Sequence, residues 1–305
     1  MKHIPITIGI VTKNRTPQLS LCIDSICNQQ LFPSDQLVIV DNSSDNSTNH
    51  LVSHIKKEKK LKATITYTHD PLSNLPLLRN QVLKKSINNW VVYIDDDCIA
   101  HPKWISEIQR SIFLYPHAAI ITGAAYAINR SNVYSITTEI NELYWKSQSR
   151  QHNSILNFEA TDNKNIICNL NFFSHNHISY DKKLVLFYGC SEDCDLGRQI
   201  QRAGGEGYYN ASQIIYHNNV TAFLTYFYRL FMRLGGNYGY SQKWRMYDNK
   251  RQGIHVMKIA FLSTYFRTNK YSYLFRLQVV LLLVTTFIYI RFVKLFMYCY
   301  YRVRQ

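Results

Sequence analysis

Three adjacent carboxylates follow directly after a short apolar segment. Trp90–Ile94 is apolar throughout, and Asp95, Asp96 and Asp97 come immediately after it. This pattern predicts a buried strand that ends at the edge of a sheet, where open α/β sheets bind their ligands. Adjacent carboxylates repel one another, and Mg²⁺ or Mn²⁺ would remove that repulsion because these ions prefer oxygen ligands. The segment therefore favours a metal site, with a solvated acidic turn as the alternative.

A second group of acids lies near the start of a predicted helix. The segment Gly189–Leu196 contains Glu192, Asp193 and Asp195, and the helix is expected to end near Arg202. A carboxylate at this place could act as a general base that takes the proton of a substrate hydroxyl. The helix dipole also favours acids in a first helical turn, without any catalytic role. The sequence leaves both interpretations open.

A histidine follows the last strand expected in this region. Gly207–Tyr216 is predicted to be a strand, and His217 comes directly after it. A lone histidine at a strand end is usually a surface residue, although neutral imidazole is a common metal ligand. We therefore expect His217 to join the metal only if its strand ends beside that of Asp97.

Polar loops at other predicted strand ends could contact a nucleotide. Aspartate accepts hydrogen bonds from ring N–H groups and sugar hydroxyls, and arginine can contact a base or a phosphate. Each loop is a weak indication alone, because turns are rich in Asp, Asn and Ser in any case. The candidate nucleotide or donor contacts outside the first acidic cluster are Thr12, Asn14, Arg15, Asp41, Ser43, Asp45 and Arg79.

Strand and helix patterns alternate along the first 128 residues. This alternation predicts an α/β fold with a doubly wound, mostly parallel sheet. The regularity fails between Asn129 and Tyr188, where only a short helix near Thr138–Ser147 is expected. The expected strands of the regular part are Ile4–Thr12, Gln36–Val40, Ala63–Thr68, Trp90–Ile94 and Ala118–Ile128, and the helices include Thr16 to about Gln30, Leu75–Ile87 and Pro102 to about Leu114.

The basic charge of the chain is concentrated in its last part. The 305 residues carry 35 Lys and Arg against 20 Asp and Glu. Residues 218–305 hold 14 of these basic residues and a single acid, Asp248, so their net charge is +13 and that of residues 1–217 is only +2. A nucleic-acid-binding protein more often has its basic residues on the folded face, so nucleic acid is not an expected partner. A basic, aromatic-rich tail instead indicates an anionic membrane surface.

The tail also contains an apolar run that is short for a membrane span. Leu277–Ile290 is apolar over 14 residues apart from Gln278, Thr285 and Thr286, and Arg291 follows it. About 20 residues are needed to cross a bilayer as a helix. We therefore expect residues 253–305 to lie on the membrane in a peripheral or monotopic manner, with a tilted span or a buried helix pair as alternatives.

Cysteine usage and the N-terminus indicate the cytoplasmic side of that membrane. The seven cysteines form no C-x-x-C pair, and unpaired thiols are typical of a reducing compartment. Met1–Thr12 lacks the pattern of a signal peptide and leads directly into a predicted strand. We expect the folded part to face the cytoplasm.

Taken together, the motifs resemble the family 2 glycosyltransferases of the GT-A fold. The resemblance extends from Ile4 to His217, about two-thirds of the chain. No single motif is specific, but five in the same order and spacing are a strong indication. The matching segments are Ile8–Arg15, Val40–Asp45, Leu78–Asn80, Ile94–Asp97 and Gly189–Leu196.

The resemblance assigns a role to each candidate residue. It implies that Asp97 is the metal ligand of a DxD motif, with Mg²⁺ or Mn²⁺ bound, and that His217 completes the metal site. Asp95 and Asp96 would contact the donor, a UDP-sugar in the first instance, and Thr12 and Asp41 the nucleotide. The carboxylate pair Glu192 and Asp193 would provide the catalytic base, Asp193, and transfer would invert the anomeric carbon.

Two features depart from the family pattern. Leu75–Leu78 stands where the family usually has Gly and Ala, so close packing of that helix is in doubt. No Gln-x-x-Arg-Trp sequence follows Asp193, and that motif marks processive synthases, so a single-addition enzyme is expected. The expected domains are residues 1–217, with a nucleotide-sugar half (1–128) and an acceptor half (129–217), and a tail, 218–305. The acceptor would be a glycan or a lipid-linked precursor. A metal-dependent nucleotidyltransferase and a non-catalytic membrane-surface protein are the alternatives.

Overall fold

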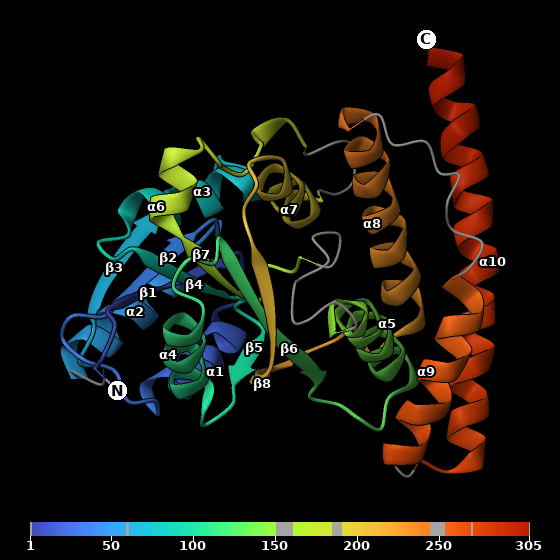
Figure 1. Cartoon of the computed structure of the whole chain (residues 1–305), viewed down its shortest axis with the longest axis horizontal. Helices are drawn as coiled ribbons and strands as arrows, with labels where there is room; N and C mark the ends of the chain where they lie inside the picture. The colour runs from blue at the N-terminus through green and yellow to red at the C-terminus, as the bar shows by residue number, and fades with distance from the viewer. Residues whose placement is uncertain are drawn as a thin grey trace. The chain divides into compact units, whose positions relative to one another are not determined.

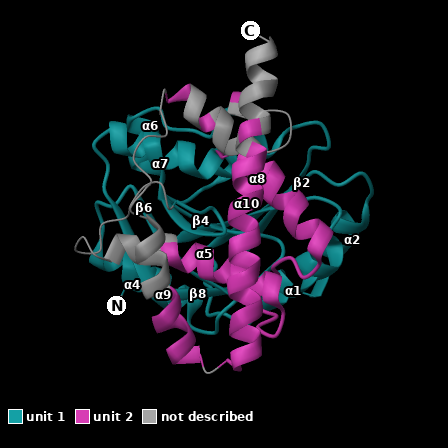
Figure 2. Ribbon diagram, turned by 90° about the vertical axis from the view of Figure 1, so that its right-hand side faces the viewer, with its two compact units in different colours: residues 1–126, 146–182, 192–217 teal, residues 127–145, 183–191, 218–305 magenta. Residues whose placement is uncertain are grey.

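The computed structural model describes residues 2–58, 61–150, 161–184, 191–244, 254–269 and 271–304. The chain divides into two compact units, drawn in different colours in Figure 2. Unit 1 comprises residues 1–126, 146–182 and 192–217, and unit 2 comprises residues 127–145, 183–191 and 218–305. The tail expected from residue 218 onward thus shares a unit with residues 127–145, and we had expected all but the first two of these residues in the acceptor half (129–217) of the catalytic domain.

Unit 1 is built on one mixed sheet of eight strands, in the order β3-β2-β1-β4-β7-β6-β8-β5. The first four strands in this order are parallel, as expected. Strand β7 is antiparallel to both β4 and β6, and β5 is antiparallel to β8, so the sheet is less parallel than predicted. The strands are β1 Ile6–Thr12, β2 Gln36–Asp41, β3 Thr64–His69, β4 Trp90–Ile94, β5 Cys98–Ala100, β6 Ile120–Ala127, β7 Asn165–Asn169 and β8 Gly207–His217.

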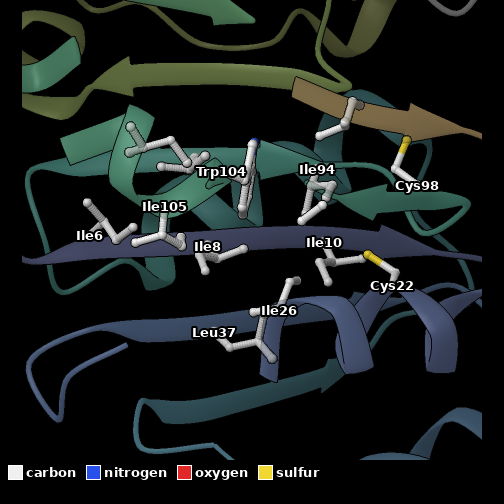
Figure 3. Packing of buried hydrophobic residues seen from close by; sticks show 14 of the residues in the cluster. Ile6, Ile8, Ile10, Cys22, Ile26, Leu37, Ile94, Cys98, Trp104 and Ile105 are labelled. Atoms are coloured by element: carbon white, nitrogen blue, oxygen red, sulfur yellow. The ribbon is translucent and has the colours of Figure 1, made fainter. Parts of the chain in front are cut away.

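Helices cover both faces of this sheet (Figure 1). One face packs against α1 Thr16–Cys27, α2 Ser47–Glu58 and α4 Trp104–Leu114, and the other against α3 Leu75–Lys85, α6 Leu170–His175 and α7 Glu192–Arg202. Successive residues of a strand point to opposite faces. Ile6, Ile8 and Ile10 of β1 therefore all enter the first of these two cores, with Trp104 and Ile105 of α4 beside them (Figure 3). This arrangement fixes which strand residues can point toward a site at the sheet edge.

Close packing of α3 depends on a glycine in the strand beneath it. A Cβ atom on Gly9 of β1 would lie 2.3 Å from Cγ1 of Val82 in α3. The helix itself carries Leu75–Leu78, where small residues are usual in the family, and this raised doubt about close approach. The missing side chain of Gly9 provides the space instead. Helix α3 begins with a regular cap, in which the Asn74 side chain accepts a hydrogen bond from the Leu77 N–H at 3.2 Å.

Unit 2 is helical in the part that the structure describes. It contains α5 Val133–Arg150, whose last turn belongs to unit 1, together with α8 Phe223–Lys243, α9 Ile254–Asn269 and α10 Tyr273–Arg304. Glu139 of α5 is buried and accepts hydrogen bonds from the Ala127 N–H, from Arg130 and from the Tyr265 hydroxyl of α9. A buried carboxylate with three donors is fully compensated, so this cluster joins α5 firmly to α9.

Helix α10 has one packed side and one exposed apolar side. Val279, Leu282, Thr286 and Val293 are buried, and the Tyr226 hydroxyl of α8 lies 3.1 Å from that of Thr286. In the described part of the chain, Tyr273–Val293 is the one helical segment long and apolar enough to cross a membrane. A 21-residue segment is closer to the length that a membrane-spanning helix needs than the 14-residue apolar run in the sequence. The exposed large apolar residues of α10 are Tyr273, Leu274, Leu277, Val280, Leu281, Val284, Phe287, Ile288, Phe292 and Leu295.

Candidate active site

The parallel half of the sheet brings its polar strand ends together. Thr12 of β1 is in register with Asp41 of β2, and β4 lies on the other side of β1. Carboxyl ends of parallel strands meet at one edge of a sheet, which is where these folds bind ligands. The Thr12 hydroxyl donates a hydrogen bond to Asp96 Oδ2 at 2.8 Å. The first acidic cluster is therefore tied directly to the end of β1.

Arg15 occupies the position where a cation would neutralise the first acidic cluster. Its Nη1 atom lies 3.0 Å from both Asp96 Oδ1 and Asp97 Oδ2. Arg15 is the N-cap residue of α1 Thr16–Cys27, and its side chain makes no capping hydrogen bond. Burial raises the pKa of Asp96 to about 6, although the Arg15 guanidinium and the Thr12 hydroxyl act in the opposite direction. The cluster thus attracts positive charge from within the chain.

A short strand pair places His217 beside Asp97. Cys98 of β5 pairs directly with His217 of β8, and Asp97 is the residue before β5. His217 Nε2 lies 3.3 Å from Asp97 Oδ1, and ligand atoms of Asp97, Cys98 and His217 all lie within 4.8 Å of one another. This meets the geometric condition that we had set for His217. Carboxylate, imidazole and thiol side chains at these distances fit a divalent cation.

Arg79 connects the two acidic clusters, which are about a hundred residues apart in the sequence. Its Nη2 atom donates to Asp95 Oδ1 at 3.3 Å, and its Nε atom lies 3.4 Å from Glu192 Oε1. The Arg79 side chain is buried and lies over the Tyr93 ring. Burial alone would lower the pKa of Arg79, but the two carboxylates outweigh it and raise that pKa above its ordinary value. Arg79 therefore stays charged and holds both clusters.

Asp193 lies in the first turn of α7, next to this connection. Its Oδ1 atom accepts a hydrogen bond from the Cys194 N–H at 2.8 Å, as expected for an acid at a helix N-terminus. Burial, followed by the nearby Glu192 and Asp162 carboxylates, raises the pKa of Asp193 to about 7. A carboxylate with such a pKa is suited to accept a proton near neutral pH. The capping and the basic roles are thus compatible in one residue.

The candidate nucleotide loops are ordered by hydrogen bonds of their own. Asp41 is buried, and its two carboxylate oxygens accept from the Ser43 N–H and from the Tyr67 hydroxyl. Asn14 adopts a positive φ of 53° and links the two loops, because its N–H donates to Ser43 Oγ at 2.8 Å. Asp45 is exposed, and its side chain accepts a hydrogen bond from the Ser47 N–H at the start of α2.

Comparison with known proteins identifies the family of this chain. Residues 7–180, more than half of the chain, match the family described as Glycosyl transferase family 2. The chain belongs to glycosyl transferase family 2. It is 24% identical over 225 residues to chondroitin synthase of Escherichia coli, a match that covers 65% of this chain and 32% of that protein. The chain spans about a third of the length of the curated relatives that it matches.

Solved structures of other glycosyltransferases share the fold of this family 2 chain. A mannosyltransferase from Pyrobaculum calidifontis, solved with GDP-Man and Mn²⁺, has a TM-score of 0.60 at 11% identity, covering 95% of this chain and 86% of that one. S. aureus TarS 1–349, solved with UDP-GlcNAc, has a TM-score of 0.56 at 15% identity, covering 94% of this chain and 82% of that one. These likenesses establish the GT-A fold.

A strand that sequence reasoning missed brings further polar residues to the site of this family 2 member. Residues 162–164 lead into β7, which begins at Asn165 and lies between β4 and β6. Asn163 donates to Glu192 Oε1 at 3.4 Å and accepts from the Tyr180 hydroxyl at 2.9 Å. Lys164 lies 3.5 Å from Asp162, and its charge opposes the burial that raises the pKa of Asp95. Strand β7 contains only three apolar residues, so its sequence shows no alternating apolar pattern from which a strand could be predicted.

The antiparallel half of the sheet is held by a buried polar network. Asn165 of β7 accepts hydrogen bonds from the Trp104 ring N–H at 2.9 Å and from the Gln213 side chain at 2.7 Å. Its own amide donates to main-chain oxygens of β6 and β8. A Cβ atom on Gly123 would lie 2.2 Å from this amide, so glycine is required there. The network fixes β8, and with it His217, in the sheet.

The second acidic cluster is described only in part. Gly189 and Cys190, which belong to the motif expected at this place, lie outside the described residues. Asp195, the third acid, is fully buried and accepts a hydrogen bond from Gln199 at 2.8 Å within α7. Glu192 and Asp193 remain the candidates at this end of the site.

Proposed function

We propose that this chain is an inverting, metal-dependent glycosyltransferase that moves a sugar from a nucleotide-diphosphate donor to an acceptor hydroxyl. The observation that carries the proposal is the buried Arg79, which contacts Asp95 on one side and Glu192 on the other. A DxD-type acid cluster and a candidate base thereby belong to one site. Membership of glycosyl transferase family 2 supports the same reaction class.

Asp193 is the proposed catalytic base. Its raised pKa lets it accept the proton of an acceptor hydroxyl while that oxygen attacks the anomeric carbon. The bond from the anomeric carbon to the diphosphate oxygen breaks as the new glycosidic bond forms. Attack from the side opposite the leaving diphosphate inverts the anomeric centre. Glu192, which contacts Arg79 and Asn163, positions Asp193 at the start of α7.

The donor would bind along the carboxyl ends of β1, β2 and β4. Asp41, held by Tyr67 and Ser43, is placed to accept from a base N–H or a ribose hydroxyl, and Asp95 is the proposed sugar or ribose contact. Arg15, now on Asp96 and Asp97, could move to a donor phosphate. A UDP-sugar is the first candidate, since TarS of the same fold was solved with UDP-GlcNAc.

Asp97 and His217 are the proposed protein ligands of a divalent cation, Mg²⁺ or Mn²⁺. The contact of Arg15 with Asp97 supports a cation at this place, because the carboxylates already hold a positive group there. When bound, such a cation supplies charge neutralisation for the leaving diphosphate. The mannosyltransferase of the same fold was solved with Mn²⁺.

The acceptor is proposed to be a glycan or lipid-linked precursor at the cytoplasmic face of a membrane. The exposed apolar side of α10 and the net charge of +13 in residues 218–305 both support attachment to an anionic membrane. A relative named chondroitin synthase agrees with a role in polysaccharide synthesis. The missing Gln-x-x-Arg-Trp motif favours a single addition for each acceptor.

A panel of nucleotide sugars tests this function. With Mn²⁺ present, we expect one or more donors to bind and to release a nucleoside diphosphate. Asp193→Asn should keep donor binding and lose transfer by about 100-fold or more, the usual contribution of a general base. Asp24→Asn on the exposed surface of α1 is the matched control and should keep full activity. Release of pyrophosphate would identify a nucleotidyltransferase instead, and a full-activity Asp193→Asn variant would exclude Asp193 as the base.

A further inference from the structure

A thiol lies beside the two proposed metal ligands. Cys98 of β5 is directly opposite His217 of β8 in an antiparallel strand pair. Directly paired residues point to the same face of a sheet, with their Cβ atoms about 4.5–5.5 Å apart. Cys98 also follows Asp97 in the chain, and one ligand atom from each of the three residues lies within 4.8 Å of the others. The position of the thiol therefore follows from strand register as well as from side-chain rotamers.

Two of the three distances within this group are close to those around a tetrahedral ion, and the third, between Cys98 and His217, is no longer than 4.8 Å. Metal–ligand distances of about 2.0–2.3 Å place neighbouring ligand atoms roughly 3.3–3.8 Å apart. His217 Nε2 and Asp97 Oδ1 are 3.3 Å apart, which already matches. Cys98 Sγ and Asp97 Oδ1 are 4.0 Å apart, so this edge must shorten by only a few tenths of an ångström.

The chemistry of the three donors differs from that of a purely acidic site. A carboxylate alone suits Mg²⁺, but sulfur and nitrogen ligands suit softer ions such as Co²⁺ and Zn²⁺. Three protein ligands with one open position are also the usual arrangement of a catalytic zinc site. Mg²⁺ prefers six oxygen ligands and gains nothing from a thiol.

We propose that Cys98 is a third protein ligand of the metal site and that the site binds Co²⁺ or Zn²⁺ more tightly than Mg²⁺ before the donor binds. The inference rests on the proposed function only in assuming that Asp97 and His217 hold a cation. Binding converts the Cys98 thiol to a thiolate, and its proton passes to solvent. The open fourth position is left for an oxygen of the donor.

Cys22 provides an internal comparison for a cysteine without this role. Cys22 and Cys98 are both buried at the end of the core where Ile10 and Ile94 lie (Figure 3). Cys22 Sγ donates to the main-chain oxygen of Asp95 at 3.5 Å and is not part of the three-residue group. A thiol that only fills the core should therefore behave like Cys22 when metal is added.

Cobalt binding to the full chain in detergent tests the proposal. With one equivalent of Co²⁺, we expect a sulfur-to-cobalt charge-transfer band in the near ultraviolet and intense visible bands typical of tetrahedral coordination. Cys98→Ser should lose the charge-transfer band and weaken Co²⁺ binding at least about tenfold, while Mg²⁺ binding stays unchanged. Cys22→Ser is the matched control and should keep both the band and the affinity. A Cys98→Ser variant with an unchanged band and affinity would overturn the proposal.

X-ray absorption tests the same proposal if the Cys98→Ser variant does not fold. In Cys22→Ser protein loaded with one equivalent of Zn²⁺, we expect one sulfur neighbour at about 2.3 Å. A first shell of nitrogen and oxygen alone would exclude the thiol. Sugar transfer with Mn²⁺ is measured in parallel. An active enzyme that lacks the sulfur signal would exclude only the role of Cys98, whereas failure of every metal to bind would exclude the metal site of the proposed function itself.

Discussion

The three acids of the first cluster are in three different environments, although they are adjacent in the sequence. Asp95 faces Arg79, and Asp97 faces Arg15 and His217. Asp96 is buried, and both of its oxygens accept hydrogen bonds from residues that follow β1 or end it. Its environment fits a residue that holds the loop after β1, more than one that reaches a donor. The family resemblance implied a donor contact for Asp96, and the sequence could not indicate these hydrogen bonds to the end of β1 and the loop after it.

The raised pKa of Asp193 predicts how activity depends on pH. A base accepts a proton only when it is ionised, and the pKa of Asp193 in the free enzyme is about 7. We therefore expect kcat/KM to rise tenfold per pH unit below about 7 and to level off above it. Initial rates with one identified donor between pH 5 and 9 measure this acidic limb, the rise of kcat/KM with pH. A profile that is flat from pH 5 to 7 would contradict the assignment of Asp193 as the base.

The charge of Arg79 should determine the pH at which the acidic limb of the kcat/KM profile lies. Its positive charge acts to lower the pKa of Asp193, so its removal should raise that pKa further. We expect Arg79→Gln to move the acidic limb of kcat/KM to higher pH and Arg79→Lys, which keeps the charge, to restore most of the shift. Arg110→Gln, at an exposed position of α4, is the control and should leave the profile unchanged. An unshifted limb in Arg79→Gln would show that this charge does not act on the base.

At the scale of elements, the sequence predicted the parallel half of the sheet well and the antiparallel half poorly. The strands β1, β2 and β4 are apolar runs that end in polar loops, so both the strands and their ligand edge could be predicted. Strand β5 has three residues, and β7 lies in an Asn-rich stretch, so neither produced a periodic pattern. The closeness of His217 to Asp97 depends on β5 and could therefore be stated only as a condition.

The buried network around Asn165 should contribute strongly to stability. Asn165→Ala removes the acceptor of Trp104 and Gln213 and leaves their buried donors without that partner. Each unsatisfied buried group costs about 1–3 kcal/mol, so we expect a loss of roughly 2–5 kcal/mol in the free energy of unfolding. Denaturant unfolding monitored by tryptophan fluorescence measures this loss. Asn171→Ala at an exposed position is the control, with a change within about 0.5 kcal/mol. Equal effects of the two substitutions would contradict the role of the network.

At the scale of the whole molecule, the helices after residue 217 form a folded unit together with part of the preceding chain. Ile136 and Ile140 of α5 share a buried cluster with Tyr265, Phe266 and Val279. The sequence indicated a basic and apolar tail, but it could not indicate that α5 packs with that tail. Truncation at residue 217 would expose this cluster and leave Glu139 without its Tyr265 partner. Membrane attachment is therefore better tested by substitutions on exposed residues than by deletion.

Charged substitutions on the exposed side of α10 should release the protein from membranes. Leu281, Val284 and Ile288 are all more than half exposed, so lysine at these positions disturbs little packing. A lysine within the hydrocarbon costs about 2.5–3.5 kcal/mol, so three of them should shift membrane binding by several orders of magnitude. Flotation with vesicles that contain anionic lipid measures the bound fraction.

The control variant carries lysine at three exposed apolar positions of unit 1, Leu72, Phe113 and Leu114, and adds the same charge. We expect the control to stay bound, since lysine elsewhere only strengthens attraction to anionic lipid. Release of both variants, or of neither, would contradict attachment through this side of α10.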